Sequence, residues 1–381
     1  MVTHNSRVDG EEASDGSLDR GRSAEGFPEV FRDVEDLEEF MTRPHRALVE
    51  DLEQVAGDIL ILGVAGKMGP TLARLAKRAA PKKRIVGVAR FSDPGVRAKL
   101  EAWGVETIAS DLLSREQIAA LPALPNVIYM AGRKFGDAGS LDLTWAMNVF
   151  APALVAEVFA ASRIVVFSTG CVYPYANVLY QGATELTPIN PPAGEYANSC
   201  VGRERMFEYF SRLRGTLGRI VRLNYAIDMR YGVLHDVARK VFSGMPVDLT
   251  TGHVNVIWQG DANSHALRAL RHCTLPTTPI NVSGPETISI RALAQAFGAR
   301  FGREPVFSGT EADSAWLVNT AESAKLLGYP RVPLGQMMDW VAAWVKTGLP
   351  TLDKPTQFEI RDGVFTAPKP KPQNARSARR R

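Results

Sequence analysis

Short runs of apolar residues alternate with amphipathic stretches through the middle of this chain. The apolar runs are Ile59–Leu62, Ile85–Ala89, Val105–Ala109, Val127–Ala131, Ile164–Phe167 and Ile220–Leu223. Stretches with helical spacing separate them, for example Met68–Arg78, Trp145–Ala161 and Tyr196–Leu213. Strands that are buried on both faces read as continuous Val/Ile/Leu runs, because helices cover both sides of a parallel sheet. The pattern therefore predicts an α/β fold, a Rossmann doubly wound parallel sheet, over residues 58–223.

The alternation becomes less regular after residue 223. Short strands are predicted at His253–Trp258 and Ile280–Val282, and helices at Ala262–Arg271, Ile290–Phe301 and Leu334–Val345. We interpret 224–349 as a smaller C-terminal α/β lobe that binds substrate. Before the sheet, 27–57 is predicted to form a short helical lead-in, with helices at Val34–Met41 and His45–Val55. The polar segment 1–26 is predicted to be a disordered tail, and 350–381 an extended basic tail.

Composition narrows the class of protein further. Of the 381 residues, 45% are hydrophobic and 23% are charged, as in soluble globular proteins. No stretch approaches the ~20 continuous apolar residues of a membrane span, and the N-terminus lacks the apolar segment of a secretory signal. We therefore expect a cytoplasmic protein without a membrane partner. The net charge of +4 comes in part from the C-terminal tail, so no nucleic-acid partner is expected. The cysteines and histidines show no metal-ligand spacing, so no metal site is expected.

The first predicted strand ends in a glycine-rich turn, Gly63-Val64-Ala65-Gly66-Lys67-Met68-Gly69, and a helix follows at once. Glycines here allow a tight turn, close approach of the backbone to a pyrophosphate, and close contact between helix and strand. The helix N-terminus adds free N–H groups and a partial positive charge. A glycine triplet alone is often only a turn. Its place between a buried strand and a helix predicts a dinucleotide site formed by Gly63, Gly66, Lys67, Met68 and Gly69.

The residue after the second strand bears on which dinucleotide binds. An NAD site usually has an acidic residue there for the ribose 2′-hydroxyl, but this chain has Arg90, which could pair with a 2′-phosphate. Lys67 could add to that positive charge. We therefore favour NADP, and NAD remains possible if Arg90 is only a solvated residue at the strand end. After the third strand, Asp111 and Leu112 are expected beside the adenine, where Asp111 could accept a hydrogen bond.

Further segments resemble a known family. They are Met130-Ala131-Gly132, Met147-Asn148-Val149, Ser168-Thr169-Gly170-Cys171-Val172-Tyr173-Pro174 and Arg222-Leu223-Asn224-Tyr225. With the glycine spacing, they resemble the NAD-dependent epimerase/dehydratase branch of the extended short-chain dehydrogenases/reductases, over about residues 58–345. The resemblance implies that Ala131, Gly132 and Asn148 line the cofactor, that Thr169 supplies a catalytic hydroxyl, and that Asn224 faces substrate.

The resemblance also implies an activity. Hydride would pass between a nicotinamide and a secondary hydroxyl of a sugar, sugar acid or sugar nucleotide, with net oxidation or epimerisation as the outcome. Dehydration is the least favoured, because Gly170 and Cys171 stand where added acid/base residues would be expected. The family also implies a homodimer through the helices Trp145–Ala161 and Tyr196–Leu213.

The chain departs from the family's Tyr-x-x-x-Lys signature, because Cys200 follows Tyr196 at the lysine position. A tyrosine with a pKa of ~10 is a poor base at neutral pH, and a nearby ammonium favours the phenolate. In the family that lysine also binds the nicotinamide ribose. A spacing of four places Tyr196 and Cys200 on one helix face, so both are expected at the cofactor.

Three interpretations of this replacement stay open. Another cation could act instead: Arg133 and Lys134 follow the fourth strand, and Arg203 and Arg205 lie further along the same helix. Tyr196 could act only as an acid, during carbonyl reduction. Alternatively, the fold could bind a dinucleotide without turnover, as a sensor or scaffold.

The cations Arg133 and Lys134, and the thiol of Cys200, each have more than one possible role. Arg133 and Lys134 could bind a carboxylate or phosphate of the substrate, or they could be solvated loop residues. Cys200 could in principle be a nucleophile, but a reactive thiol needs a depressed pKa, and a small buried helix cysteine is the more ordinary interpretation.

Overall fold

A computed structural model describes residues 26–134, 140–354, 356–363 and 365. Its centre is a seven-stranded sheet with the order β12-β7-β5-β4-β1-β2-β3, in which every neighbouring pair is parallel. The strands are β1 (Ile59–Leu62), β2 (Ile85–Ala89), β3 (Glu106–Ala109), β4 (Asn126–Tyr129), β5 (Arg163–Thr169), β7 (Gly218–Leu223) and β12 (Thr278–Val282). The order reverses between β1 and β4, and ligands of such sheets bind outside the carboxyl ends at this point. The predicted Rossmann fold is confirmed.

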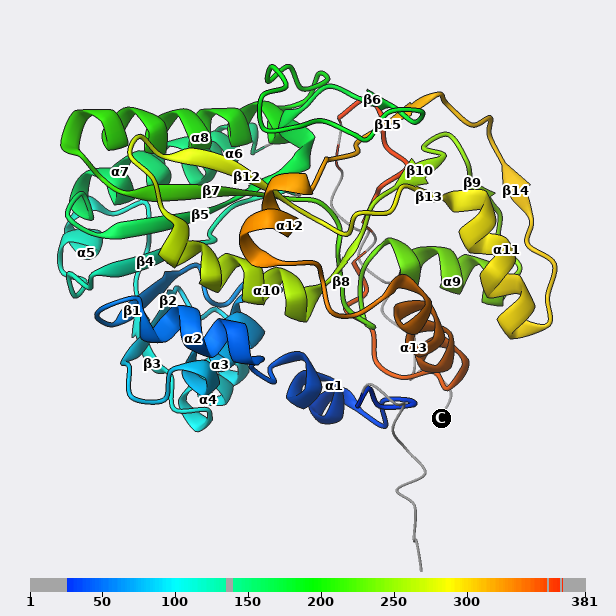
Figure 1. The fold of residues 1–381 in the computed structure, drawn as a ribbon, viewed down its shortest axis with the longest axis horizontal. Helices are drawn as coiled ribbons and strands as arrows, with labels where there is room; N and C mark the ends of the chain where they lie inside the picture. The colour runs from blue at the N-terminus through cyan, green and yellow to red at the C-terminus, as the bar shows by residue number, and fades with distance from the viewer. Residues whose placement is uncertain (1–25, 135–139, 355, 364, 366–381) are drawn as a thin grey trace, which may run out of the picture.

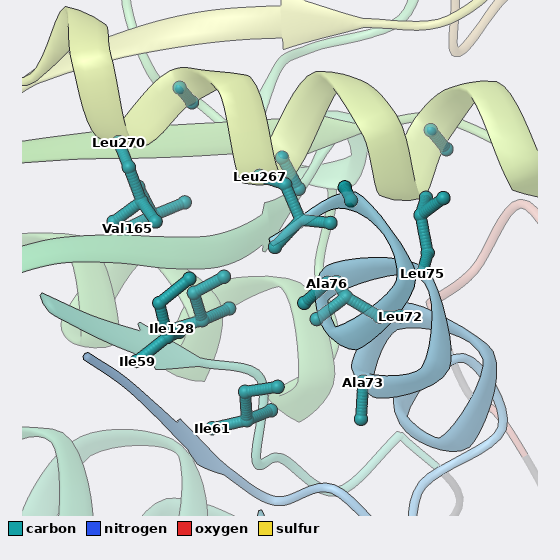
Figure 2. Close-up of a cluster of buried hydrophobic side chains, with 14 of the residues drawn as sticks. Ile59, Ile61, Leu72, Ala73, Leu75, Ala76, Ile128, Val165, Leu267 and Leu270 are labelled. Atoms are coloured by element: carbon teal, nitrogen blue, oxygen red, sulfur yellow. The ribbon is translucent and has the colours of Figure 1, made fainter. Parts of the chain in front are cut away.

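The strands are apolar throughout because helices cover both faces of the sheet. Ile59 and Ile61 pack on one face against α2 (Arg46–Glu53), α3 (Gly69–Ala79), α4 (Pro94–Ala102) and α10 (Gln259–Arg268), with the 3-10 turn Ala269–His272 after α10. Figure 2 shows this face, where Ile59, Ile61 and Ile128 point toward Leu72 of α3 and Leu267 of α10. Leu60 and Leu62 pack on the other face against α5 (Arg115–Ala119), α7 (Ala151–Val158) and α8 (Glu195–Arg214).

The second half of the chain contributes more to the sheet than its sequence pattern indicates. We assigned Ile280–Val282 to the C-terminal lobe, but this segment is part of β12, which pairs in parallel with β7 at the edge of the central sheet. Helix α10 and α12 (Ala321–Leu327) also pack on this body. The reason is that a strand at the edge of a sheet needs only one neighbour, which a distant segment can supply.

The remaining residues of the second half build a smaller lobe around α9 (Val233–Ser243), α11 (Ile290–Phe301) and α13 (Leu334–Lys346), to the right in Figure 1. The predicted strand His253–Trp258 is divided into β10 (His253–Val254) and β11 (Ile257–Trp258). The other short strands are β6 (Ala176–Asn177), β8 (Ala226–Ile227), β9 (Val247–Asp248), β13 (Ile288–Ser289), β14 (Phe307–Ser308) and β15 (Ser314–Ala315).

The two predicted lead-in helices belong to different lobes. Helix α2 covers the sheet, whereas α1 (Val34–Met41) and the residues before it complete the core of the second lobe. There Phe31 and Phe40 pack against Trp340, with ring centroids 4.8 and 5.3 Å apart. The N-terminal segment is therefore part of the second lobe, although most of that lobe is formed by residues near the other end of the sequence.

One helical run in the described part of the chain, Leu141–Val158, is long and apolar enough to span a membrane by length and composition. It comprises α6 (Leu141–Trp145), the π-helical turn Ala146–Phe150 and α7. This run packs along α8 and covers one face of the sheet, which is the place of a layer helix in a doubly wound fold.

Candidate active site

The glycine turn between β1 and α3 has the geometry of a phosphate-binding turn. Gly63 has φ +91°, and a Cβ there would lie 2.5 Å from the backbone nitrogen of Ala131. A Cβ on Gly69 would lie 2.0 Å from the carbonyl oxygen of Val64. At Gly66 the nearest atom is 3.4 Å away, so this residue presents open backbone. The first and third glycines are thus required by the fold, while the middle one leaves room for a ligand, as a dinucleotide pyrophosphate requires.

A cavity of about 330 Å³ opens beside this turn, outside the carboxyl ends of the strands. Its lining comes from both lobes and includes Lys67, Lys134, Thr169, Tyr196, Asn224, Tyr225, Tyr231 and Thr356. Among the described residues that line it there are two lysines and no carboxylate. The structure brings five of the predicted site residues together at this pocket: Lys67, Lys134, Thr169, Tyr196 and Asn224.

Thr169 and Tyr196 bring the two hydroxyls of the predicted catalytic pair to the pocket. Thr169 is the last residue of β5, and its Oγ1 accepts a hydrogen bond from the Cys171 backbone at 3.2 Å. Tyr196 lies in the first turn of α8. Burial raises the pKa of Tyr196 well above its ordinary value, while the charge of Arg203 and a hydrogen bond with Thr169 oppose the rise. In this state Tyr196 is a protonated phenol at neutral pH.

Cys200 lies beneath the pocket rather than in its lining. Its side chain is fully buried in a small apolar cluster with Val172, Tyr173 and Val318. Burial raises the pKa of its thiol to about 11, so the group is a neutral thiol. This environment is that of a structural cysteine and does not favour the nucleophile hypothesis.

A buried arginine lies one helical turn beyond Cys200. Side chains of a helix lean toward its N-terminus, and Arg203 does so, since its Nη1 donates to the Phe167 carbonyl at 2.9 Å and its Nη2 to Asn148 at 2.6 Å. A Cβ on Gly132 would lie 2.4 Å from this Nη2. Arg203 therefore brings a buried positive charge under the ends of β4 and β5. Arg205, the other helix candidate, instead pairs with Glu208 at 2.7 Å.

Asn148 belongs to a layer behind the pocket. It lies in the π-helical turn, its side chain is fully buried, and its Oδ1 also accepts from the backbone of Arg133 at 2.9 Å. Its Nδ2 donates to Ser199 and to the Arg133 carbonyl. Asn148 thus holds the loop after β4 and the start of α8 in place. The sequence analysis instead predicted that Asn148 lines the cofactor. Single π turns of this kind are frequent at functional sites.

The adjacent cations Arg133 and Lys134 have different environments. Lys134 lines the pocket, where its Nζ lies 5.9 Å from the ring centroid of Tyr196 and donates to the Thr356 carbonyl at 3.1 Å. Arg133 does not line the pocket, and its backbone is bound by Asn148. Burial lowers the pKa of Lys134 from its ordinary value.

Lys67 extends from the glycine turn across to the second lobe. Its Nζ donates to the Ala226 carbonyl at 3.2 Å and lies 4.2 Å from the ring centroid of Tyr231. Burial lowers its pKa to about 8, and Asp228 opposes the shift. The expectation that Lys67 adds charge beside Arg90 does not match this position, because the side chain points toward the substrate side of the turn.

The residues expected around the adenosine half lie at the ends of β2, β3 and β4. Arg90 directly follows β2 and is exposed. Asp111 follows β3 and accepts a hydrogen bond from the Leu113 backbone at 3.0 Å. The Leu112 side chain is buried in the core, so only its backbone could contact a cofactor. Gly132 is exposed after β4.

Asn224 lines the pocket, but its amide nitrogen is already held. Its Nδ2 donates to Asn255 at 2.7 Å and to the Trp316 carbonyl at 3.0 Å. The next residue, Tyr225, has φ +41° and also lines the pocket. A positive φ at a large non-glycine residue is uncommon, and such conformations cluster at binding sites. Sequence reasoning missed Tyr225, because nothing in the local pattern signals its backbone conformation.

Sequence reasoning also missed the C-terminal strap, the described residues 350–354, 356–363 and 365. The strap leaves α13 and passes over the pocket. Thr356 lines the pocket, and its backbone N–H and Oγ1 donate to one oxygen of Asp236 at 2.8 and 2.6 Å. Phe365 packs edge-on against the ring of Tyr196, with centroids 5.7 Å apart. This part of the predicted basic tail is thus packed structure at the site.

A doubly wound sheet, an open glycine turn and paired Thr/Tyr hydroxyls define a nicotinamide-dinucleotide-binding protein of the short-chain dehydrogenase/reductase class. The chain belongs to the NAD dependent epimerase/dehydratase family, whose model matches residues 59–255. A comparison with curated proteins finds no match to the sequence.

Solved structures with the same fold include nucleotide-sugar epimerases. The UDP-glucuronic acid 4-epimerase from Bacillus cereus in complex with NAD has a TM-score of 0.64 at 16% identity, covering 76% of this chain and 99% of that one. The Thermus thermophilus UDP-glucose 4-epimerase complex with NAD has a TM-score of 0.61 at 18% identity, covering 77% and 100%. The Thermotoga maritima UDP-glucose 4-epimerase with UDP-glucose has a TM-score of 0.61 at 16% identity, covering 76% and 99%. At these identities the likeness establishes the fold.

Proposed function

We propose that the protein is an NAD(P)-dependent oxidoreductase or epimerase that acts on a secondary hydroxyl of a sugar, sugar acid or sugar nucleotide. The observation that carries this proposal is the presence of the Thr169 and Tyr196 hydroxyls in one pocket that begins at the open glycine turn. Family membership supports the use of a nicotinamide dinucleotide. The epimerases with the same fold act on UDP-sugars, which supports a sugar-type substrate.

The residues present fit a dinucleotide at the glycine turn, with Gly66, Met68 and the N-terminus of α3 facing the pyrophosphate. When bound, the nicotinamide would exchange a hydride with the carbinol carbon of the substrate. Thr169 would hold the reacting oxygen by a hydrogen bond. Tyr196 would give a proton to that oxygen in the direction of carbonyl reduction, the role that its protonated state favours.

Oxidation requires Tyr196 to accept a proton, and this needs positive charge nearby. Two cations support it: Lys134 above the Tyr196 ring, and Arg203 buried beneath. We propose that these two take over the electrostatic role of the missing lysine. The opposing candidate is a dinucleotide-binding sensor or scaffold, which the raised pKa of Tyr196 and the neutral Cys200 thiol favour.

A Tyr196→Phe variant tests the catalytic proposal. We expect cofactor affinity to stay unchanged in titration calorimetry, and turnover of a sugar and sugar-acid panel with NAD or NADP to fall by about 10²- to 10⁴-fold, the usual contribution of a positioned general acid or base. Product analysis would separate oxidation from epimerisation. Cofactor binding by the wild type without turnover of any panel member would support the sensor instead.

For the cofactor, we propose a preference for NADP, supported by Arg90 at the end of β2 where no acidic residue stands.

We also propose a homodimer through α6, α7 and α8. Apolar side chains are exposed along the outer faces of these helices and of the π turn between α6 and α7: Leu141, Trp145, Phe150, Tyr209 and Leu213. Ultracentrifugation of a Tyr209→Glu, Leu213→Glu variant should show monomers if this face is the interface.

A further inference from the structure

The positive charge of the pocket calls for an anionic ligand. The ammonium groups of Lys67 and Lys134 both line it, and the described lining residues include no acidic side chain. Both lysines are partly buried, and burial disfavours the charge of each. A bound anion would compensate for this loss of hydration.

The two lysines serve different parts of the pocket. Lys67 belongs to the glycine turn, and its Nζ reaches the Ala226 carbonyl and the ring of Tyr231 in the second lobe. Lys134 follows β4 and lies over the Tyr196 ring. An anionic group held by Lys134 would therefore place a neighbouring carbinol near Tyr196 and Thr169, whereas one held by Lys67 would not. This assigns Lys134 to the substrate.

The C-terminal strap holds Lys134 in this position and joins both lobes over the pocket. The Thr356 carbonyl accepts from Lys134, while its N–H and hydroxyl donate to Asp236 of α9. Further along, Phe365 contacts both Tyr196 and Lys134; the lysine Nζ lies 4.7 Å from its ring centroid. The strap therefore forms a wall of the site and not a loose cover.

The wall also limits the size of the ligand. The cavity of about 330 Å³ lies at the low end of the roughly 300–1,000 Å³ that holds one drug-sized ligand. Part of it belongs to the cofactor, because Gly66, Met68 and Met130 line it. The space that remains between these residues and Thr356 is smaller than the whole cavity and suits a ligand of monosaccharide size.

We propose that the strap and Lys134 together determine substrate specificity, selecting a sugar of monosaccharide size that carries an anionic group, a carboxylate or a phosphate, over a nucleotide sugar. This inference rests on the proposed function and names the substrate class of the same site. Lys134 would contact the anionic group, Thr356 would close the pocket around the sugar, and Phe365 would support Tyr196 and Lys134 from behind.

The test is titration calorimetry of the full chain saturated with NAD or NADP. The probes are D-glucuronate, D-glucose 1-phosphate, D-glucose and UDP-glucuronate. We expect one of the first two to bind at least tenfold more tightly than D-glucose and UDP-glucuronate; which of the two binds shows whether the anion is a carboxylate or a phosphate. Lys134→Gln should remove this preference, while Lys354→Gln, which removes the same charge from an exposed position of the strap, should keep it.

A Thr356→Gly, Phe365→Ala variant opens the wall and keeps Lys134 itself, together with the backbone carbonyl at position 356 that accepts from it. We expect it to gain at least tenfold in affinity for UDP-glucuronate relative to the monosaccharides. Thermal unfolding and cofactor affinity close to wild type show that these variants are folded. Tighter binding of UDP-glucuronate by the wild type, unchanged in the strap variant, would overturn the inference. Absence of cofactor binding would instead overturn the proposed function.

Discussion

The two ends of the cleft are built in different ways. At the cofactor end, one contiguous segment, 59–69, supplies the strand, turn and helix start, and it acts through open backbone and the absence of side chains. At the substrate end, side chains converge from Lys134, Thr169, Tyr196, Tyr225 and Thr356, which are widely separated in sequence. The first end depends mainly on local geometry, with the backbone of Ala131 packed against Gly63, whereas the second depends on how the whole chain is packed.

The largest effect is expected at the cofactor end, from exchanging two glycines of the turn for alanine. Gly69→Ala places a Cβ 2.0 Å from the Val64 carbonyl, and no flexible side chain can move to relieve this contact. We expect a loss of several kcal/mol, a large share of the usual stability of about 5–15 kcal/mol, visible as a strongly reduced melting temperature.

Gly66→Ala is the matched control. Its Cβ would meet only the Gly63 carbonyl at 3.4 Å, so the variant should fold normally. It should nevertheless lose cofactor affinity at least tenfold in calorimetry, because the methyl group would occupy the space for the pyrophosphate. Equal melting temperatures for the two variants would show that the third glycine is not required by the fold.

Restoring the family's lysine should be harmful at the substrate end. Cys200→Lys would bury an ammonium in an apolar cluster, close to the buried guanidinium of Arg203. We expect a loss of about 3–5 kcal/mol in denaturant unfolding, as for other uncompensated buried charges. Cys200→Ala, which adds no charge, should cost about 1 kcal/mol. A Cys200→Lys variant with wild-type stability and increased turnover would show that the missing cation limits the native protein.

A smaller effect is expected for the choice of cofactor. Arg90→Asp should weaken NADP about tenfold or more, since the guanidinium–phosphate pair becomes a repulsive one, and should leave NAD affinity nearly unchanged. Calorimetry with both dinucleotides measures the ratio. An equal loss for both would contradict the pairing of Arg90 with a 2′-phosphate.

The smallest effect is expected on the pH dependence of stability, at the Asp236 carboxylate that binds the strap. Burial raises the pKa of Asp236 from 3.8 to about 6, so the folded state binds this proton more tightly than the unfolded chain. The contribution of Asp236 to stability is therefore greatest below pH 4 and is lost as the pH rises through about 6. Asp236→Asn should remove this dependence, so its melting temperature relative to wild type should rise between pH 4 and pH 7.

Asp261 provides the control for that variant. Burial raises its pKa to about 6 as well, but it lies in α10 and accepts from the backbone of Arg331 and Val332. Asp261→Asn should change the pH dependence of stability in the same direction and leave affinity for anionic sugars unchanged. If the difference in melting temperature between wild type and Asp236→Asn did not vary with pH, this would contradict a raised pKa for the Asp236 carboxyl.

The contrast between the two ends also explains what could be predicted from sequence. Strands such as Ile85–Ala89 and the glycine turn were predicted with their bounds because their signals are local. Thr169 and Tyr196 were found through the family's motifs. Thr356 and Tyr231 were not, because neither belongs to a motif and both reach the pocket through tertiary packing. The edge strand β12 was assigned to the wrong lobe because a short apolar run does not reveal its partner.

The aromatic core of the second lobe has a consequence for biogenesis. A hydrogen bond from Trp340 to the Pro28 carbonyl joins residues 312 positions apart, and Thr356 reaches back 120 positions to Asp236. Contacts of such long range close large loops and form late in folding. During synthesis, the sheet can assemble while the second lobe still lacks α13 and the strap. Until α13 and the strap have been made, the apolar surfaces of α1 and α9 that they cover stay exposed, and exposed surfaces of this kind favour aggregation.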